Sequence, residues 1–380
     1  MKRLLCGIKK YPLFFLFGLF LTGYMVCDMC KYNTEYSEME NRMLAQRPAF
    51  TLSGFLDNTF TPKYETYVND QFVWRDSWIS LKSRTELAIG KIENNGIVYG
   101  KDHYLFEKYE KADDQRVEMN LRFLNEFFAQ YPQPMTFAVV PNSYEVLSEK
   151  LPYGLCQLDQ EEYIRRIYGE VDAPQVRTLD LLPALREHRD EYIYYRTDHH
   201  WTADGAYLAY RAYAESMGFV PVEKDALPGR TDVEGFYGTY FSKCKLFNAV
   251  PDVLTYYDIP VTEVTINGEA ADGLYDYSKF SGRDKYAGLL RGNNGLTVIR
   301  SGNNTAPEEE TTRILVIKDS YANSLVPFLT YHYDEVYVVD LRSLPMKMSE
   351  LMAETDFDEV LVLYNFMNLA SDTNIARLRY

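Results

Sequence analysis

Ser320 follows a short apolar run and is a candidate nucleophile. Residues 314–317 are aliphatic, and the chain then passes through Asp319 into a segment that can be helical. This pattern predicts that Ser320 stands at the carboxyl end of a buried strand, where open α/β sheets carry their active sites. An Asp-Ser pair before a helix is also an ordinary N-cap, so this stretch alone leaves both interpretations open.

A second stretch supplies a base and an acid for such a serine. Asp198, His199 and His200 follow a strand-like run at residues 192–195. A neutral imidazole can take the proton of a serine hydroxyl if an acceptor holds its other nitrogen. In an extended Asp-x-His segment the first and third side chains point the same way, so Asp198 can orient His200 while His199 faces elsewhere. Loss of His200 should then abolish activity, and loss of His199 should leave a substantial fraction.

The same side chains could instead hold a metal ion. A phosphoesterase-like set of nitrogen and oxygen ligands would be Asp198, His199, His200, Asp204 and Asp319. Adjacent histidines rarely ligate one metal together, and the chain has no His-x-His or His-Glu-x-x-His spacing. We therefore expect no metal or other cofactor, and a metal-dependent hydrolase stays as an alternative.

Four further residues could contact the substrate or stabilise an oxyanion. Asn142, at the end of another apolar run, and Asn323 are candidate donors beside the backbone N–H of Ser320. Asn142 also fits an ordinary turn. Tyr321 and Trp201 adjoin the expected nucleophile and base, and Trp201 could pack beneath the motif or stack on a sugar ring.

Three short runs carry a resemblance to a known family. The Asp-His-His-Trp run at residues 198–201, the Asp-Ser-Tyr run at 319–321 and the Glu-Asn-Arg run at 40–42 resemble the DHHW family. That family is similar to the SGNH-hydrolase-like O-acetyltransferases of the alginate AlgX/AlgJ type, in which an Asp-x-His-Trp motif supplies acid and base and a later Ser is the nucleophile. The resemblance covers roughly residues 35–380. One departure is Lys318, which stands where SGNH enzymes usually have the Gly of Gly-Asp-Ser.

The resemblance implies a fold and a chemistry. The expected fold is an SGNH-hydrolase-like three-layer α/β sandwich with a mostly parallel sheet, and the implied catalytic residues are Asp198, His200 and Ser320. The implied function is an extracytoplasmic O-acetyltransferase, or O-acetylesterase, acting on a cell-surface or exported polysaccharide through an acetyl-serine intermediate. The resemblance also implies that a membrane-bound O-acyltransferase delivers the acetyl donor.

Composition is consistent with these expectations. The 33 tyrosines suit a carbohydrate-contacting surface, although many of them must lie in the core. The net charge of −15 argues against a nucleic-acid partner. A non-catalytic polysaccharide-binding protein on the same fold is a further alternative, and it would keep the side chains of Ser320 and His200 apart.

The first 30 residues have the pattern of a signal anchor or signal peptide. Four basic residues precede an apolar run at residues 11–27: Lys2, Arg3, Lys9 and Lys10. Because no small-x-small cleavage site follows, we expect an uncleaved anchor in the cell membrane, with the rest of the chain outside.

The remaining chain predicts two further regions. We expect a stalk and helical extension at residues 31–95 and the α/β domain at 96–380, with a β-rich insertion, which could be a small subdomain, at about 220–310. One mostly parallel sheet should contain the apolar runs at 135–140, 192–195, 314–317, 336–339 and 360–363. Cys156 and Cys244 could pair outside the cell or stay free.

Overall fold

A computed structural model describes residues 10–304 and 311–380 of the chain. The basic residues Lys2, Arg3 and Lys9 therefore lie outside the described residues, as does the end of the expected insertion at 305–310. The described chain divides into two compact units. Unit 1 comprises the residues up to Lys91 together with Lys245–Asn248, and unit 2 comprises Ile92–Cys244 and Ala249–Tyr380.

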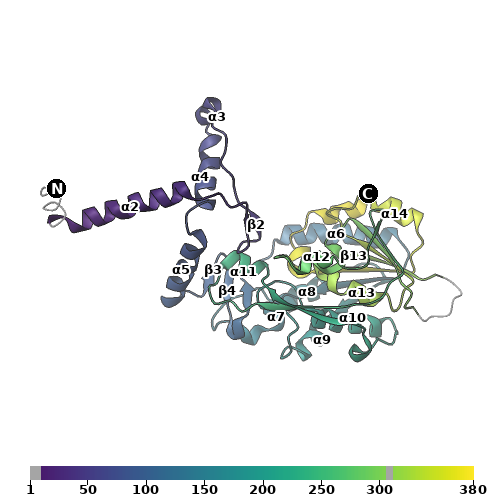
Figure 1. The fold of residues 1–380 in the computed structure, drawn as a ribbon. Helices are drawn as coiled ribbons and strands as arrows, with labels where there is room; N and C mark the ends of the chain where they lie inside the picture. Colours follow the sequence, from purple (N-terminus) through teal and green to yellow (C-terminus); the bar gives the residue numbers. More distant parts are fainter. Residues whose placement is uncertain (1–9, 305–310) are drawn as a thin grey trace. The chain divides into compact units, whose positions relative to one another are not determined.

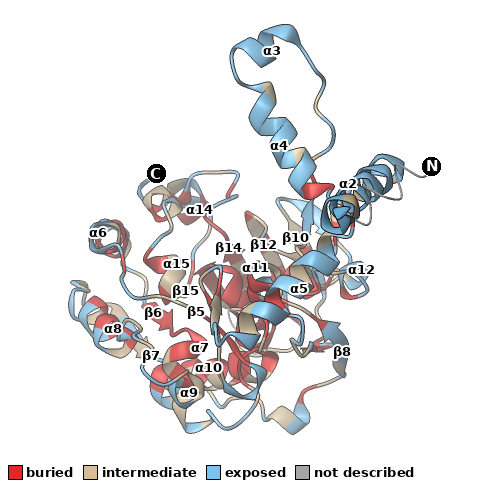
Figure 2. Cartoon of the chain, turned by 90° about the vertical axis from the view of Figure 1, so that its left-hand side faces the viewer, coloured by how far each residue is buried: buried red, intermediate tan, exposed pale blue. Residues whose placement is uncertain are grey.

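Unit 1 is largely helical, and much of it is exposed (Figure 2). Its elements are α2 (Pro12–Cys30), β1 (Tyr36–Ser37), β2 (Arg42–Met43), α3 (Leu52–Leu56), α4 (Phe60–Asp70) and α5 (Arg75–Ala88). By length and composition, α2 could cross a membrane, and none of its residues is buried. The region expected as a stalk and helical extension contains α3, α4 and α5.

An ion network organises the polar centre of unit 1. Arg42 places its guanidinium on both carboxylate oxygens of Asp70, at 2.8 and 2.5 Å. Glu40 pairs with Arg75 at 2.8 Å and with Lys245. Burial raises the pKa of Glu40, but the hydrogen bonds from Lys245 and Arg75 outweigh it and leave that pKa below its ordinary value. The Glu-Asn-Arg run thus has a structural use, because two of its side chains hold the unit together.

Unit 2 contains an eight-stranded sheet in the order β11-β10-β12-β14-β13-β15-β6-β7. The strands are β6 (Met135–Val140), β7 (Val176–Asp180), β10 (Glu263–Ile266), β11 (Glu269–Ala271), β12 (Leu296–Arg300), β13 (Arg313–Lys318), β14 (Glu335–Val339) and β15 (Glu359–Asn365). The five strands from β14 to β7 are parallel, and β12, β10 and β11 extend the sheet in antiparallel pairing.

Helices cover both faces of this sheet (Figure 1). One face carries α6 (Asp114–Gln130), α8 (Gln160–Gly169) and α14 (Met348–Glu354). The other carries α7 (Ser143–Val146), α9 (Leu182–Glu187), α10 (Ala203–Ser216) and α13 (Val326–Leu329). Successive residues of β13 alternate between the two cores, since side chains alternate across a strand. The expected mostly parallel α/β sandwich is confirmed.

Shorter elements complete unit 2. They are β3 (Glu93–Asn94), β4 (Ile97–Tyr99), β5 (Leu105–Glu107), β8 (Arg230–Phe236), α11 (Thr239–Cys244), β9 (Asp252–Tyr257), α12 (Tyr277–Phe280) and α15 (Phe366–Leu369), with the 3-10 helices η1 (Lys101–His103), η2 (Ser148–Lys150), η3 (Lys224–Ala226), η4 (Tyr286–Arg291), η5 (Ser320–Ser324) and η6 (Asn374–Arg379).

One predicted strand is wrong. Residues 192–195 form no strand of the sheet, and Tyr194 makes an isolated antiparallel bridge with Trp201 instead. The backbone hydrogen bonds of this run close a loop on itself, from Tyr195 N to His200 O and from Thr202 N to Ile193 O. The apolar residues at 193–195 pack in the same core as α10 and not between strands. An apolar sequence pattern cannot distinguish burial against a helix from burial in a sheet.

The insertion is β-rich, but it is not a separate subdomain. β10, β11 and β12 join the main sheet, while β8 and β9 pair with each other. Cys156 is exposed with a free thiol, so it does not pair with the buried Cys244.

Because β13 is buried on both faces, shortening one of its side chains should leave a cavity and destabilise the fold. Leu315 is 0% exposed between two neighbouring strands, so Leu315→Ala should lower the free energy of unfolding by about 2–5 kcal/mol. Val220, which is 86% exposed, is the control, and Val220→Ala should leave that free energy almost unchanged in the same denaturant titration. Equal losses in the two variants would contradict this description of the core.

Candidate active site

Ser320 lies at the carboxyl end of β13, where η5 begins. The preceding Asp319 caps this turn, because its carboxylate accepts the backbone N–H of Tyr321 at 2.9 Å. Its other oxygen accepts the backbone N–H of Asn365 and the side-chain amide of Asn368, both at 2.7 Å. Asp319 is thus committed to holding the turn, and burial raises its pKa.

The side chains of Ser320, His200 and Asp198 form a continuous hydrogen-bonded chain. His200 Nε2 lies 2.8 Å from Ser320 Oγ, and His200 Nδ1 lies 2.5 Å from Asp198 Oδ1. Each of the three side chains is nearly buried. This geometry is the one that a serine nucleophile, a general base and an orienting carboxylate require.

Asp198 is a buried carboxylate whose partners keep it ionised. Its Oδ1 also accepts the backbone N–H of His200 at 3.0 Å, and its Oδ2 accepts the backbone N–H of Thr239 at 2.7 Å. Burial raises the pKa of Asp198, but the nearby charges of His199 and His200 and these hydrogen bonds outweigh it and hold that pKa far below its ordinary value. Such partners offset the desolvation cost of a carboxylate.

A bend, and not an extended strand, brings Asp198 and His200 together. Asp252 fixes the start of this bend, since its carboxylate accepts the backbone N–H groups of Arg196 and Thr197, both at 2.8 Å, and the Thr197 hydroxyl at 2.6 Å. Asp252 is 0% exposed and lies some 50 residues downstream in the chain. Sequence spacing carries no signal for this support.

His199 does not face away from the site, so that expectation is wrong. Its ring centroid lies 3.7 Å from that of His200, and its Nδ1 lies 2.7 Å from Thr239 Oγ1 and 3.4 Å from Asp198 Oδ1. Burial, together with the charge of His200, lowers the pKa of His199 to about 4. His199 is therefore neutral near pH 7 and packs beside His200.

The alternative metal site is only partly assembled. Ligand atoms of Asp198, His199 and His200 lie within 4.8 Å of one another. Of the other expected ligands, Asp204 pairs with Lys224 at 2.6 Å, and Asp319 is held by its own hydrogen bonds. Asp198 and His200 also bond to each other, and His200 bonds to Ser320, so the five-ligand set considered as an alternative is not brought together.

Tyr286 is a site residue that sequence reasoning missed. Its ring stacks on His200 with centroids 3.7 Å apart and planes at 10°, and its hydroxyl donates to the carbonyl oxygen of Ser320 at 2.9 Å. It comes from η4 in the insertion, and nothing in the sequence marks it among 33 tyrosines. His200 is thus held between the rings of His199 and Tyr286.

Each asparagine proposed as an oxyanion donor has a hydrogen-bond partner for its side-chain amide. Asn323 donates to Asn293 at 3.2 Å and accepts from Lys318 at 2.8 Å. Asn142 exchanges hydrogen bonds with Gln160, and its side-chain N–H lies 3.5 Å from the hydroxyl of Tyr321. Within η5, the backbone N–H of Tyr321 donates to the carboxylate of Asp319 and that of Ala322 to its carbonyl, so the backbone N–H of Ser320 is the expected donor that these bonds leave in place.

The two aromatic candidates lie under the site. Trp201 is 0% exposed, and its indole N–H is shared by the carbonyl of Tyr321 at 2.9 Å and the hydroxyl of Ser324 at 3.0 Å. Tyr321 is equally buried and donates its hydroxyl to the carbonyl of His199. These bonds connect the loop of His200 to the turn of Ser320, and burial keeps both rings from stacking on a sugar.

Lys318, at the position of the usual glycine, is a buried cation behind Ser320. It is 1% exposed and donates to the side-chain oxygens of Asn293 and Asn323 at 2.8 Å, with Asp340 at 3.5 Å. Burial lowers the pKa of Lys318 to about 8, although Asp340 opposes that shift.

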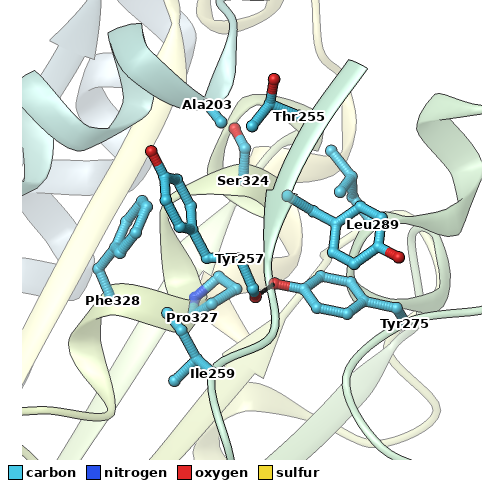
Figure 3. Close-up of a pocket in the computed structure, with 10 residues that line it drawn as sticks. Ala203, Thr255, Tyr257, Ile259, Tyr275, Leu289, Ser324, Pro327 and Phe328 are labelled. Carbon is cyan, nitrogen blue, oxygen red and sulfur yellow. Dashed lines mark hydrogen bonds between the residues drawn. The ribbon is translucent and has the colours of Figure 1, made fainter. Parts of the chain in front are cut away.

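A small cavity adjoins η5 at Ser324 (Figure 3). Tyr257, Tyr275, Leu289 and Phe328 contribute to its lining, and the hydroxyl of Tyr275 donates to the carbonyl of Tyr257 at 2.8 Å. Its volume is about 10 Å³, enough for one water molecule but not for a sugar ring.

The chain is similar to several known proteins. A family model described as DHHW protein matches residues 155–339. A DHHW family protein from Eubacterium siraeum has a similar structure, with a TM-score of 0.63 and 26% identity over 76% of this chain and 96% of that one. PatB1 of Bacillus cereus, solved with a sulfonyl adduct, has a TM-score of 0.61 and 23% identity over 74% of this chain and 97% of that one.

One curated protein is also similar. A probable alginate O-acetylase, AlgJ of Pseudomonas fluorescens, is 25% identical over 172 residues, and the match spans 43% of each chain. The chain therefore matches less than half the length of this relative. Together these matches confirm the resemblance to the DHHW family and the mixed α/β fold.

A substitution at Gly238 should displace the side chain of Asp198. Gly238 is buried, and a Cβ there would overlap the side chain of Asp198. Gly238→Ala should therefore lower the turnover of an activated acetyl ester by roughly 100-fold, since misplacing a catalytic group by about 1 Å has that effect. Gly169→Ala, whose Cβ meets nothing within 4 Å, is the control and should keep full turnover. Full turnover in Gly238→Ala would refute the proposed role of Asp198.

The buried Lys318 predicts a pH-dependent stability. Between about pH 8 and 10.5 the folded protein releases this proton and the unfolded chain keeps it, so the free energy of unfolding rises with pH. Relative to Lys318→Met, the unmodified chain should gain up to about 3 kcal/mol across that window. Denaturant titrations at several pH values measure the difference, and the exposed Lys279→Met is the control. A difference that does not change with pH would contradict the prediction.

Proposed function

We propose that this protein is a membrane-anchored, extracytoplasmic O-acetyltransferase that modifies a cell-surface or exported polysaccharide. Ser320 is the nucleophile, His200 the general base and Asp198 the orienting acid. The observation that carries the proposal is the unbroken chain of contacts from Ser320 Oγ through His200 to Asp198, at 2.8 and 2.5 Å. Two segments 120 residues apart meet in this arrangement.

In the proposed mechanism each of the three side chains has one role. His200 Nε2 takes the proton of Ser320 Oγ as that oxygen attacks the carbonyl carbon of the acetyl donor, and Asp198 stabilises the imidazolium through Nδ1–H. The tetrahedral intermediate collapses to acetyl-serine, and the departing group takes the proton from His200. In the second half-reaction His200 deprotonates a sugar hydroxyl, which attacks the acetyl-serine and regenerates Ser320. The outcome is transfer when a sugar hydroxyl attacks and esterase activity when water does.

Residues around the three side chains support this cycle. The depressed pKa of Asp198 keeps the carboxylate ionised throughout the physiological pH range. Tyr286 and His199 confine the ring of His200 from both faces, which limits its rotation away from Ser320. An oxyanion forming on the acetyl group would meet the backbone N–H of Ser320.

The relatives support an acyl-transfer function. AlgJ is described as a probable alginate O-acetylase, and alginate is a polysaccharide. We infer that the acceptor here is a polysaccharide hydroxyl and that α2 holds the chain at the membrane, where a membrane-bound O-acyltransferase can present the donor. The alternative of a non-catalytic binding protein predicts separated Ser320 and His200 side chains, which their 2.8 Å contact does not support.

The proposal predicts a covalent intermediate. The purified chain, incubated with an activated acetyl ester, should accumulate one acetyl group on the peptide containing Ser320, because deacylation waits for an acceptor hydroxyl. Mass spectrometry of the digested protein measures the adduct. Ser320→Ala should lose the adduct and at least about 1,000-fold of the turnover, the scale seen when a triad member is removed. Ser371→Ala, an exposed serine, is the matched control.

The two histidines separate the triad from a metal site. His200→Ala should abolish adduct formation, and His199→Ala should keep a measurable fraction because Asp198 still orients His200. Equal loss in both variants, or activity that a chelator removes, would favour the metal-dependent hydrolase. Undiminished turnover in Ser320→Ala would contradict the role of Ser320 as the nucleophile.

A further inference from the structure

An aromatic cluster gathers around one residue of the apolar helix α2. The ring centroids of Phe72, Trp74 and Trp78 lie 5.0, 6.0 and 6.4 Å from that of Tyr24. The hydroxyl of Tyr24 donates to the carbonyl of Val73 at 2.8 Å and accepts the indole N–H of Trp78 at 2.9 Å. We call Tyr24, Phe72, Trp74 and Trp78 the aromatic collar; all four belong to unit 1.

The collar is unusually exposed for its size and composition. Phe72, Trp74 and Trp78 are 39, 58 and 41% exposed, although they contain two of the three tryptophans of the chain. The third, Trp201, is completely buried. Large aromatic side chains that gather at the surface indicate an interaction site.

Trp74 is also held in a strained backbone conformation. It precedes α5 with φ 56° and ψ 32°, in the left-handed region that glycine and asparagine adopt most easily. A bulky residue there is uncommon, and such strain concentrates at functional positions. The backbone between α4 and α5 therefore has an unfavourable conformation at Trp74, and the exposed indole of this residue lies beside Tyr24 of α2.

Helix geometry sets the depth of the collar if α2 spans a membrane. Tyr24 precedes the last residue of α2, Cys30, by six residues, which is about 9 Å of helix axis. The whole helix of 19 residues is about 28 Å long, close to the thickness of a hydrocarbon core. Asp28, one turn after Tyr24, must reach the headgroups. Tyr24 therefore lies near the boundary between acyl chains and headgroups, and it brings the other rings to the same depth.

The surface just beyond the collar is polar, as this depth requires. A cavity of about 550 Å³ beside the end of α2 is lined by residues that include Asp28, Lys31, Asn33, Arg47 and Gln71. Lys31 also donates to the backbone carbonyls of Gln71 and Phe72, at 3.3 and 3.4 Å. Apolar side chains of α2, then aromatic rings, then charged and amide groups follow one another, which is the order across a membrane interface.

We propose that the aromatic collar is a membrane-docking element that embeds in the outer interface of the lipid bilayer. Trp and Tyr favour this layer because their rings are apolar and their N–H and O–H groups stay hydrogen-bonded. The inference rests on the proposed membrane anchor and goes beyond it, because it assigns to the α4–α5 corner a second contact with the same bilayer. The anchor is then restrained by a side contact instead of acting as a freely pivoting tether.

Tryptophan quenching by brominated lipids tests the collar. The full-length chain is reconstituted into phosphatidylcholine vesicles that carry bromine either near the headgroup end of the acyl chains or near the bilayer centre. Shallow bromine should reduce the emission strongly and deep bromine should reduce it less, because Trp74 and Trp78 are the tryptophans at the interface. In Trp74→Phe/Trp78→Phe, the remaining emission of the buried Trp201 should be the same in brominated and unbrominated vesicles.

Three controls make each outcome decisive. Ser320→Ala should show unchanged quenching, so this result is independent of the proposed catalysis. Vesicle flotation tests the anchor separately: a chain that does not float with lipid refutes the span, whereas a chain that floats but shows no lipid quenching refutes only the collar. A second quencher, aqueous iodide, tests for a protein partner. The proposal would also be overturned if iodide quenched the emission of Trp74 and Trp78 in pure lipid vesicles and stopped doing so only when a membrane protein was added. If the double variant unfolds at a lower temperature, the single variants Trp74→Phe and Trp78→Phe each keep one reporter.

Discussion

The buried carboxylate of Asp198 is the constraint on which the site depends. An ionised carboxylate removed from water is costly unless hydrogen-bond donors and nearby positive charge replace the lost hydration. Here the backbone N–H groups of His200 and Thr239 and the imidazole of His200 do so. Satisfying Asp198 therefore fixes the ring of His200, and the absence of a side chain at Gly238 leaves the space that the carboxylate occupies.

The sheet supplies the other half of the arrangement. Parallel strands end at one edge, so β13 and β15 deliver Ser320 and Asn365 to the same place, and Asp319 ties the two ends together. Trp201 and Tyr321 then connect that edge to the loop of the base through hydrogen bonds to backbone carbonyls. The serine and the histidine are consequently held by two supports that also bond to each other, which fixes the orientation of the two side chains.

Lys318 shows how the chain accommodates a departure from the usual glycine. A lysine at the end of a buried strand must either reach water or find partners inside. It finds the side-chain oxygens of Asn293 and Asn323 and the carboxylate of Asp340, and Asn323 in turn donates its side-chain N–H to Asn293.

The sequence alone determined the local chemistry and most of the sheet. Short apolar runs predict buried strands wherever helices separate them, so β6, β13, β14 and β15 were predictable, and the motif at 198–201 indicated which side chains could act together. The run at 192–195 has the same composition but closes on its own loop, because burial under a helix and burial in a sheet favour the same residue types.

Only the tertiary structure decided the supports of the site. Asp252, Gly238 and Tyr286 are distant in the chain from the residues they hold, and none stands out by type or spacing. The bend that turns His199 toward His200 depends on the hydrogen bonds of Asp252, which no local pattern encodes. Residue type and spacing specify which groups can react, whereas their orientation depends on contacts between distant segments that form only when the chain folds.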